Sequence, residues 1–250
     1  MSSALPPNVW PVLLGVLGAV FGSFIATLAI RWPEGRSIAV GRSACDGCGR
    51  TLRATDLVPL LSFLVLRGRC RSCDARIAPA HWITECLGAA IGIVAGLLAP
   101  GFEGVAGAVC GWLLLASGAI DLAAFWLPDR ITVSLAIAAL VGGLAGAAPD
   151  MTERLIGGVG GFATLWLVAA FYRRVRGRTG LGGGDPKLFG AIGLWLGWRA
   201  LPVVLLIASL AGLAVVLTMA VAGRRPTATD RLPLGTLLAA AAFLCWALSV

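Results

Sequence analysis

Apolar stretches alternate with short polar segments along almost the whole chain, and most are close to the ~20 residues that an α-helix needs to cross a bilayer. Glycine and alanine are abundant in these stretches, as close helix packing in lipid requires. The pattern predicts an all-α polytopic membrane protein with about eight transmembrane helices. The stretches cover residues 9–30, 82–99, 104–127, 131–149, 155–172, 186–199, 201–222 and 232–249.

The composition leads to the same class. The chain is 58% hydrophobic and only 13% charged, with a mean hydropathy of +0.91, which excludes an ordinary soluble domain. A net charge of +8 could suggest a nucleic-acid partner. The arginines, however, cluster in the loops between apolar stretches, so we interpret them as topology signals and expect no nucleic-acid binding.

The distribution of basic residues predicts the orientation. Lysine and arginine concentrate in residues 31–76, 173–187 and 224–231, and loops rich in these residues face the cytoplasm. Arg130, which follows the third stretch, falls on the same side, and only Arg154 and Arg199 are then left on the other side. Eight crossings place both termini on the outer face.

One polar segment, residues 32–80, is long enough to form a domain outside the membrane. It separates a first transmembrane helix in residues 1–31 from the remaining apolar stretches. Within it, residues 57–66 are apolar but too few to span a bilayer. We expect this short stretch to pack on the rest of the loop domain or to lie on the membrane surface.

Two Cys-x-x-Cys pairs lie in this loop, namely Cys45 with Cys48 and Cys70 with Cys73. Four thiolates with this spacing fit one tetrahedral zinc ion. Two disulfides are the rival interpretation, but a cytoplasmic loop is in a reducing compartment. With four thiolates the coordination is closed, so the zinc is expected to be structural. The sequence therefore predicts an inserted cytoplasmic zinc-binding loop domain.

Two aspartates are expected at membrane depth. Asp121 lies inside an apolar stretch, and Asp185 follows three glycines and precedes Pro186, as a helix N-cap would. Ionisable residues are costly in a membrane and are functional candidates. Two facing carboxylates share a proton, so that one can act as base and the other as acid. The pair fits an aspartic protease, and an acid-coupled membrane carrier remains an alternative.

Several motifs, in this order, resemble the type 4 prepilin peptidase family, whose members are bifunctional leader peptidases and N-methyltransferases of the Gly-x-Gly-Asp type. The resemblance covers nearly the whole chain. It rests on Gly22-Ser23-Phe24 with Arg31-Trp32-Pro33, the four cysteines with Pro59-Leu60-Leu61-Ser62, Asp121 with Leu127-Pro128-Asp129, and Gly182-Gly183-Gly184-Asp185-Pro186-Lys187.

This resemblance implies a membrane aspartic endopeptidase of the bacterial inner membrane. Its substrates would be type IV prepilins or type II secretion pseudopilins, cleaved at the cytoplasmic face, and S-adenosylmethionine would then methylate the new N-terminus. The zinc loop and the active site would be cytoplasmic, and both termini periplasmic. Asp121 and Asp185 would be catalytic, with Asp129, Gly182, Gly184 and Lys187 in supporting roles.

The resemblance also divides the chain. Residues 100–250 would form the membrane-embedded peptidase domain, and residues 32–80, together with 1–31 and 81–99, would serve methyl transfer. Glu85 matches an acid of the family and is the methyltransferase candidate. Ala26 replaces the usual asparagine, and His81-Trp82 replaces an aromatic-proline pair. A member with peptidase activity alone is therefore the alternative.

Overall fold

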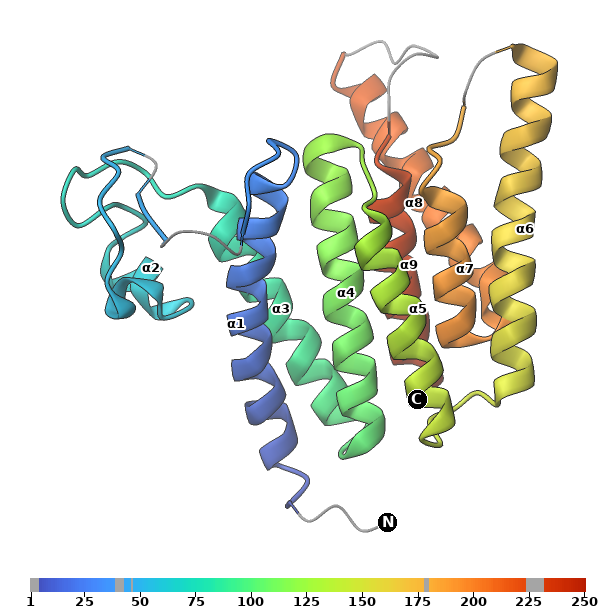
Figure 1. Cartoon of the computed structure of the whole chain (residues 1–250), viewed down its shortest axis with the longest axis horizontal. Helices are drawn as coiled ribbons and strands as arrows, with labels where there is room; N and C mark the ends of the chain where they lie inside the picture. The colour runs from blue at the N-terminus through green and yellow to red at the C-terminus, as the bar shows by residue number, and fades with distance from the viewer. Residues whose placement is uncertain (1–4, 39–42, 46, 178–179, 224–231) are drawn as a thin grey trace.

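The computed structural model describes residues 5–38, 43–45, 47–177, 180–223 and 232–250. These residues form an all-helical protein in which successive long helices run up and down the molecule (Figure 1). The long helices are α1 (Val9–Arg31), α3 (Pro79–Leu98), α4 (Phe102–Ala124), α5 (Asp129–Leu144), α6 (Met151–Arg176), α7 (Asp185–Leu196), α8 (Leu201–Val221) and α9 (Leu234–Ser249). The short ones are α2 (Leu61–Val65) and the 3₁₀ turns η1 (Ala54–Leu57) and η2 (Trp198–Ala200).

The prediction of a polytopic membrane protein is confirmed at this level. Within the described residues, five helical segments are long and apolar enough to cross a bilayer: α1, α3, α4, α6 and the segment Trp198–Val221 that contains α8. The helices α5, α7 and α9 have only 16, 12 and 16 residues. That all eight helices cross the membrane stays a prediction.

Helices α5 and α7 end earlier than their apolar stretches, because a glycine with positive φ follows each of them. Gly146 has φ +96° shortly after α5, and Gly197 has φ +77° directly after α7, a conformation that L side chains avoid. At its other end α7 begins with Asp185, and Gly184 is the N-cap. The predicted N-cap at Asp185 was therefore wrong by one residue.

Helices α1 and α3 touch through their backbones. A Cβ atom on Gly18 would lie 2.0 Å from the carbonyl oxygen of Gly88, and one on Gly22 would lie 2.6 Å from the Cα atom of Glu85. Small residues allow such an approach in membranes, where dispersion forces and not water drive helix association. Ala26, the departure noted above, is completely buried in α1.

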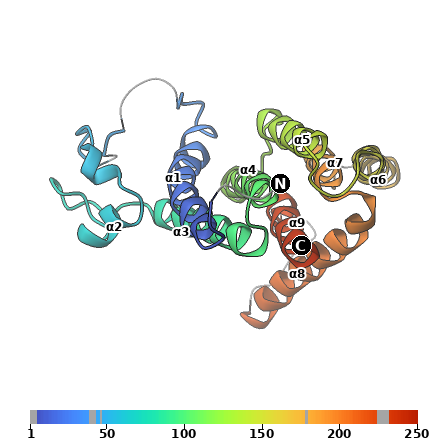
Figure 2. The ribbon, with the colours of Figure 1, turned by 90° about the horizontal axis from the view of Figure 1, so that it is seen from below.

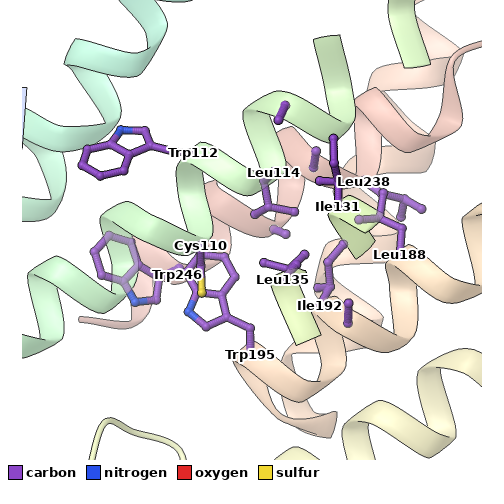
Figure 3. Close-up of a cluster of buried hydrophobic side chains, with 14 of the residues drawn as sticks. Cys110, Trp112, Leu114, Ile131, Leu135, Leu188, Ile192, Trp195, Leu238 and Trp246 are labelled. Carbon is purple, nitrogen blue, oxygen red and sulfur yellow. The ribbon is translucent and has the colours of Figure 1, made fainter. Parts of the chain in front are cut away.

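The second half of the chain converges on α7. This helix lies between α5 and α6 and also contacts α9, which in turn packs on α4 (Figure 2). Leucine, isoleucine and tryptophan side chains of α4, α5, α7 and α9 form the core here, including Leu114, Leu135, Ile192, Trp195 and Leu238 (Figure 3).

Arg154 is buried at the end of the molecule where α1 begins and α9 ends, and it links several helices. The Arg154 side chain is 1% exposed. Its guanidinium donates to six carbonyl oxygens, at distances of 2.7–3.1 Å. These belong to Ala139, Ala147, Ala148, Pro149, Leu194 and Trp195, and therefore link α5, α7 and the loop before α6.

Candidate active site

Asp121 lies in the last turn of α4 and is only 5% exposed. Its Oδ2 atom accepts a hydrogen bond from the backbone N–H of Thr236 at 2.9 Å, and the Thr236 hydroxyl lies 3.3 Å away. That hydroxyl also donates to the carbonyl oxygen of Gly118 at 2.8 Å. The first turn of α9 therefore holds this carboxylate in place.

Asp185 is the first residue of α7 and is 6% exposed. Its Oδ2 atom accepts a hydrogen bond from the backbone N–H of Gly182 at 2.9 Å. A Cβ atom on Gly182 would lie 2.9 Å from the same oxygen. A side chain at position 182 would therefore crowd the carboxylate that the N–H of this residue orients.

Leu127 brings the two acids into one site. A Cβ atom on Gly184, the residue before Asp185, would lie 2.5 Å from the Leu127 Cβ atom. A Cβ atom on Gly235 would lie 2.8 Å from Leu127 Cδ1 and 3.0 Å from Asp121 Oδ2. The segments that carry Asp121 and Asp185 thus meet around one leucine.

Asp129 and Lys187 form an ion pair beside the two acids. The Lys187 Nζ atom lies 2.6 Å from Asp129 Oδ1, and the side chains are 47% and 66% exposed. The pair connects the first residue of α5 with the first turn of α7. Exposed pairs of this kind stabilise a fold by roughly 0–1 kcal/mol, so little stability depends on this pair.

The sequence analysis missed the contribution of α9. Gly235 and Thr236 contact Asp121 from a segment more than a hundred residues further along the chain. The available signal was a threonine in the first helical turn after Pro233, at the start of an otherwise apolar stretch. A threonine there is ordinarily assigned to capping its own helix, so the signal does not identify Asp121 as the partner.

The four paired cysteines form a cluster. Their Sγ atoms all lie within 4.8 Å of one another, and those of Cys45 and Cys73 are 3.7 Å apart. A tetrahedron with Zn–S bonds of ~2.3 Å has edges of about 3.8 Å. The donor set therefore fits a single zinc ion, with two sulfurs from each Cys-x-x-Cys pair.

The two cysteine turns repeat the same geometry. In each, the N–H two residues after the first cysteine donates to its sulfur at 3.4 Å, from Gly47 to Cys45 and from Ser72 to Cys70. An antiparallel β-bridge closes each turn, between residues 44 and 51 and between residues 69 and 76. The N–H groups of Ser72 and Cys73 lower the pKa of Cys70 to about 6, which favours the thiolate that binds a metal.

Glu85 lies in a separate cavity, of about 350 Å³, between α1, α3 and the loop domain. Its side chain is 6% exposed, and its Oε2 atom accepts a hydrogen bond from the backbone N–H of Leu60 at 2.8 Å. Ser23 and Thr27 of α1, Trp82 of α3 and residues of both cysteine turns also line this cavity, whereas Asp121 and Asp185 do not.

Two family models match the chain. Residues 16–98 match the bacterial Peptidase A24 N-terminal domain, and residues 108–217 match the type IV leader peptidase family. The second range includes Asp121 and Asp185 but ends before α9. No solved structure matches significantly.

Curated bacterial proteins are similar over most of their length, and each bears the name prepilin leader peptidase/N-methyltransferase. The protein of Burkholderia pseudomallei strain K96243 is 38% identical over 95% of this chain and 85% of its own. The Klebsiella pneumoniae protein is 37% identical, over 81% of this chain and 92% of its own length. The Neisseria gonorrhoeae protein is 33% identical, over 89% of this chain and 86% of its own length. With both acids and all four cysteines inside the matched ranges, this chain belongs to the type IV leader peptidase family.

Proposed function

We propose that Asp121 and Asp185 are the catalytic pair with which this chain cleaves the leader peptides of type IV prepilins or type II secretion pseudopilins. The observation that carries the assignment is their geometry. Two buried carboxylates from α4 and α7 meet around Leu127, and their described hydrogen bonds all use Oδ2. In this proposal the Oδ1 atoms of both acids face a water molecule and the scissile peptide bond.

The hydrogen bonds assign different roles to the two acids. Asp121 accepts from the N–H of Thr236, with the hydroxyl close by, at the positive end of the α9 dipole. Hydrogen bonds and dipoles of this kind favour the charged form. Asp185, at the start of α7, accepts from the Gly182 N–H alone, so we assign the charged role to Asp121, which has two donors beside it. With Asp121 ionised and Asp185 protonated, Asp121 takes a proton from the attacking water while Asp185 donates its proton to the carbonyl oxygen. Asp121 then passes the proton from the water to the leaving amine, and Asp185 takes its proton back from the hydroxyl group as the carbonyl re-forms.

The supporting residues orient the Asp185 carboxyl group and leave space for Leu127. Gly182 provides the N–H that orients Asp185, and Gly184 leaves room for Leu127. The ion pair between Asp129 and Lys187 keeps the lysine away from Asp185. Without Asp129, a free ammonium group close by would favour the ionised form of Asp185, which cannot act as an acid.

The second proposed activity is N-methylation of the new N-terminus with S-adenosylmethionine. A volume of about 350 Å³ lies within the range of small-molecule pockets, and the buried Glu85 carboxylate can bind a positively charged group there. S-adenosylmethionine would supply an activated methyl group. Zinc, held by Cys45, Cys48, Cys70 and Cys73, would stabilise the cysteine turns that line this cavity and take no part in the chemistry.

The proposed topology has eight crossings in the bacterial inner membrane. The zinc loop and the peptidase site face the cytoplasm, and both termini face the periplasm, as the arginine distribution requires. The alternating helix directions, with α1 beginning and α9 ending toward the same side, support this topology (Figure 1). In this division residues 32–80 form the zinc domain and residues 100–250 the peptidase domain.

A peptidase without methyltransferase activity is the remaining alternative, because Ala26 departs from the family pattern. Ala26 is completely buried and is not among the cavity residues described, so the missing asparagine removes no group from the cavity. His81 and Trp82, the other departure, do line it. Family membership argues against an acid-coupled carrier.

The test of the peptidase proposal is cleavage of a purified prepilin by the purified chain, followed by mass spectrometry. Asp121→Asn and Asp185→Asn should each abolish cleavage while the protein remains folded and inserted, because one carboxylate cannot be both base and acid. Asp129→Asn removes a supporting residue that touches neither substrate nor water, and it should lower cleavage less than either of these variants. Substantial cleavage by either of the first two variants would remove that residue from the mechanism.

A further inference from the structure

Helix α2 in the loop domain has two different faces. Ser62, Phe63 and Leu66 point into the cavity described above. Leu61, Leu64 and Val65, spaced like one face of a helix, are 61%, 69% and 75% exposed. A soluble domain normally covers such a face with polar residues, whereas here every residue of the exposed face is aliphatic.

The preceding residues extend this surface. Leu57 and Val58 are 43% and 42% exposed. We call the five side chains the α2 patch: Leu57, Val58, Leu61, Leu64 and Val65. Contiguous exposed apolar surface of this kind marks an interaction site with a protein or a membrane.

The position of α2 points to the membrane. In Figure 1, α2 forms the lowest part of the loop domain and lies at the height of α1, below the end of α1 from which the loop domain starts. Phe63 stacks on Trp82 of α3, with ring centroids 5.7 Å apart. The α2 patch is therefore fixed beside two helices that are long and apolar enough to cross the bilayer.

The helix that Phe63 contacts also carries exposed apolar side chains. Ile83 and Leu87 of α3 are both 46% exposed. Such side chains on a transmembrane helix face lipid. A lipid surface that covers them would reach α2 as well.

Charge complementarity supports the same occupant. Exposed arginines flank the α2 patch on both sides in the chain, at Arg53 before it and at Arg67 after it. Basic residues next to an apolar helix face bind the phosphates of lipid headgroups.

We propose that the α2 patch inserts into the lipid leaflet beside α1 and anchors the loop domain to the membrane surface. The segment is too short to cross the bilayer, so it enters the interface and returns on the same side. Backbone hydrogen bonds such as Ser62 N–H to Val58 O and Leu64 N–H to Leu60 O satisfy the polar groups of the inserted turn. The anchor does not depend on the catalytic roles proposed above.

The test places a spin label at position 64 or 65 of the full-length chain in lipid nanodiscs. The label is attached to an encoded ketone amino acid, so the cysteines stay unmodified. Collision rates with oxygen, which concentrates in lipid, and with a water-soluble nickel chelate are then compared. Position 159 on α6, where Val159 is 73% exposed, is the lipid-facing reference, and position 51, exposed in the same loop domain, is the aqueous reference.

We expect the ratio of oxygen to nickel accessibility at positions 64 and 65 to match that at position 159 and to exceed that at position 51. A ratio like that of position 51 would show that α2 lies in water and would overturn the proposal. Protection from both reagents would show a protein partner on the patch, such as a second copy of this chain, and would overturn it as well.

Discussion

The backbone N–H of Thr236 donates to the Oδ2 atom of Asp121 across 115 residues of sequence, at 2.9 Å. The bond joins the first turn of α9 to the last turn of α4. The acid is therefore oriented by a helix that lies outside the range matched by the peptidase family model. In this chain α9 orients Asp121 as well as packing on α4.

The first prediction concerns the hydroxyl group of Thr236. Thr236→Val removes the bond to Gly118 and the contact with Asp121 but keeps the backbone N–H. A neutral hydrogen bond contributes roughly 0.5–1.5 kcal/mol, so kcat for prepilin cleavage should fall by about two- to tenfold, with KM unchanged. Thr236→Ser, which keeps the hydroxyl, should restore kcat. Equal rates for Thr236→Val and the wild type would show that the backbone N–H alone orients Asp121.

The second prediction uses two adjacent glycines. A Cβ atom at Gly184 would lie 2.5 Å from the Leu127 Cβ atom, whereas a Cβ atom at Gly183 would meet nothing within 4 Å. Overpacking of this kind costs about 1–3 kcal/mol, and the displacement of Leu127 disturbs both acids. Gly184→Ala should therefore lower cleavage strongly, and Gly183→Ala should leave it near the wild-type rate. Similar cleavage rates for the two variants would contradict the role of Leu127.

The third prediction separates the charge of Glu85 from its hydrogen bond. Glu85→Gln keeps an oxygen that can accept from the Leu60 N–H, but it removes the negative charge. Methylation of the mature pilin N-terminus should be lost while cleavage continues, and the mass of the product measures both. Glu85→Ala should in addition make the loop domain sensitive to protease. Full methylation by Glu85→Gln would show that the charge of Glu85 is not needed, and that this residue only holds the loop domain through its hydrogen bond to Leu60.

The fourth prediction concerns the metal. The purified protein should contain about one zinc ion per chain, as measured by elemental mass spectrometry. Cys45→Ser and Cys73→Ser should lower the zinc content and expose residues 43–77 to protease, because a small polar loop depends on its metal for folding. Cys86→Ser, outside the cluster, is the control. Unchanged zinc content in the first two variants would place the metal elsewhere.

The fifth prediction concerns Arg154. Arg154→Lys keeps the charge, but its three donors cannot serve six carbonyl oxygens, and each buried group left without a partner costs about 1–3 kcal/mol. The midpoint of thermal unfolding in detergent should fall clearly. Arg199→Lys is the control, since Arg199 is 73% exposed and pairs with Glu153 at 3.1 Å. Its change in stability should stay within about 0.5 kcal/mol. An equal loss of stability in both variants would show that the buried bonds of Arg154 do not stabilise the fold.

Much of the helical plan could be predicted, because a helix in lipid must be apolar over most of its length. The apolar stretches at 9–30 and 201–222 match α1 and α8 to within a residue or two. The Cys-x-x-Cys spacing was equally informative, because two residues between cysteines bring both sulfurs to one point. All four sulfurs do gather in one cluster.

Contacts between distant segments could not be predicted, since hydropathy contains no information on partners. Thr236 is one example, because no feature near residue 236 indicates Asp121. Arg154 is another. The charge pattern predicted only that this residue lies on the outer side, whereas the structure buries its side chain among carbonyl groups of α5 and α7. The early end of α7 depends on the conformation of Gly197, which the apolar pattern does not contain.

The short length of α7 has a consequence for how a peptide and water reach the acids. Twelve helical residues extend about 18 Å, and a hydrocarbon layer is about 30 Å thick. In the proposed topology, the glycine-rich turn before Asp185 therefore lies beneath the headgroups. Polar backbone at that depth needs water or protein around it, and we expect water to reach the acids there. A substrate that is itself anchored in the bilayer could then bring its scissile bond to the acids without leaving the lipid.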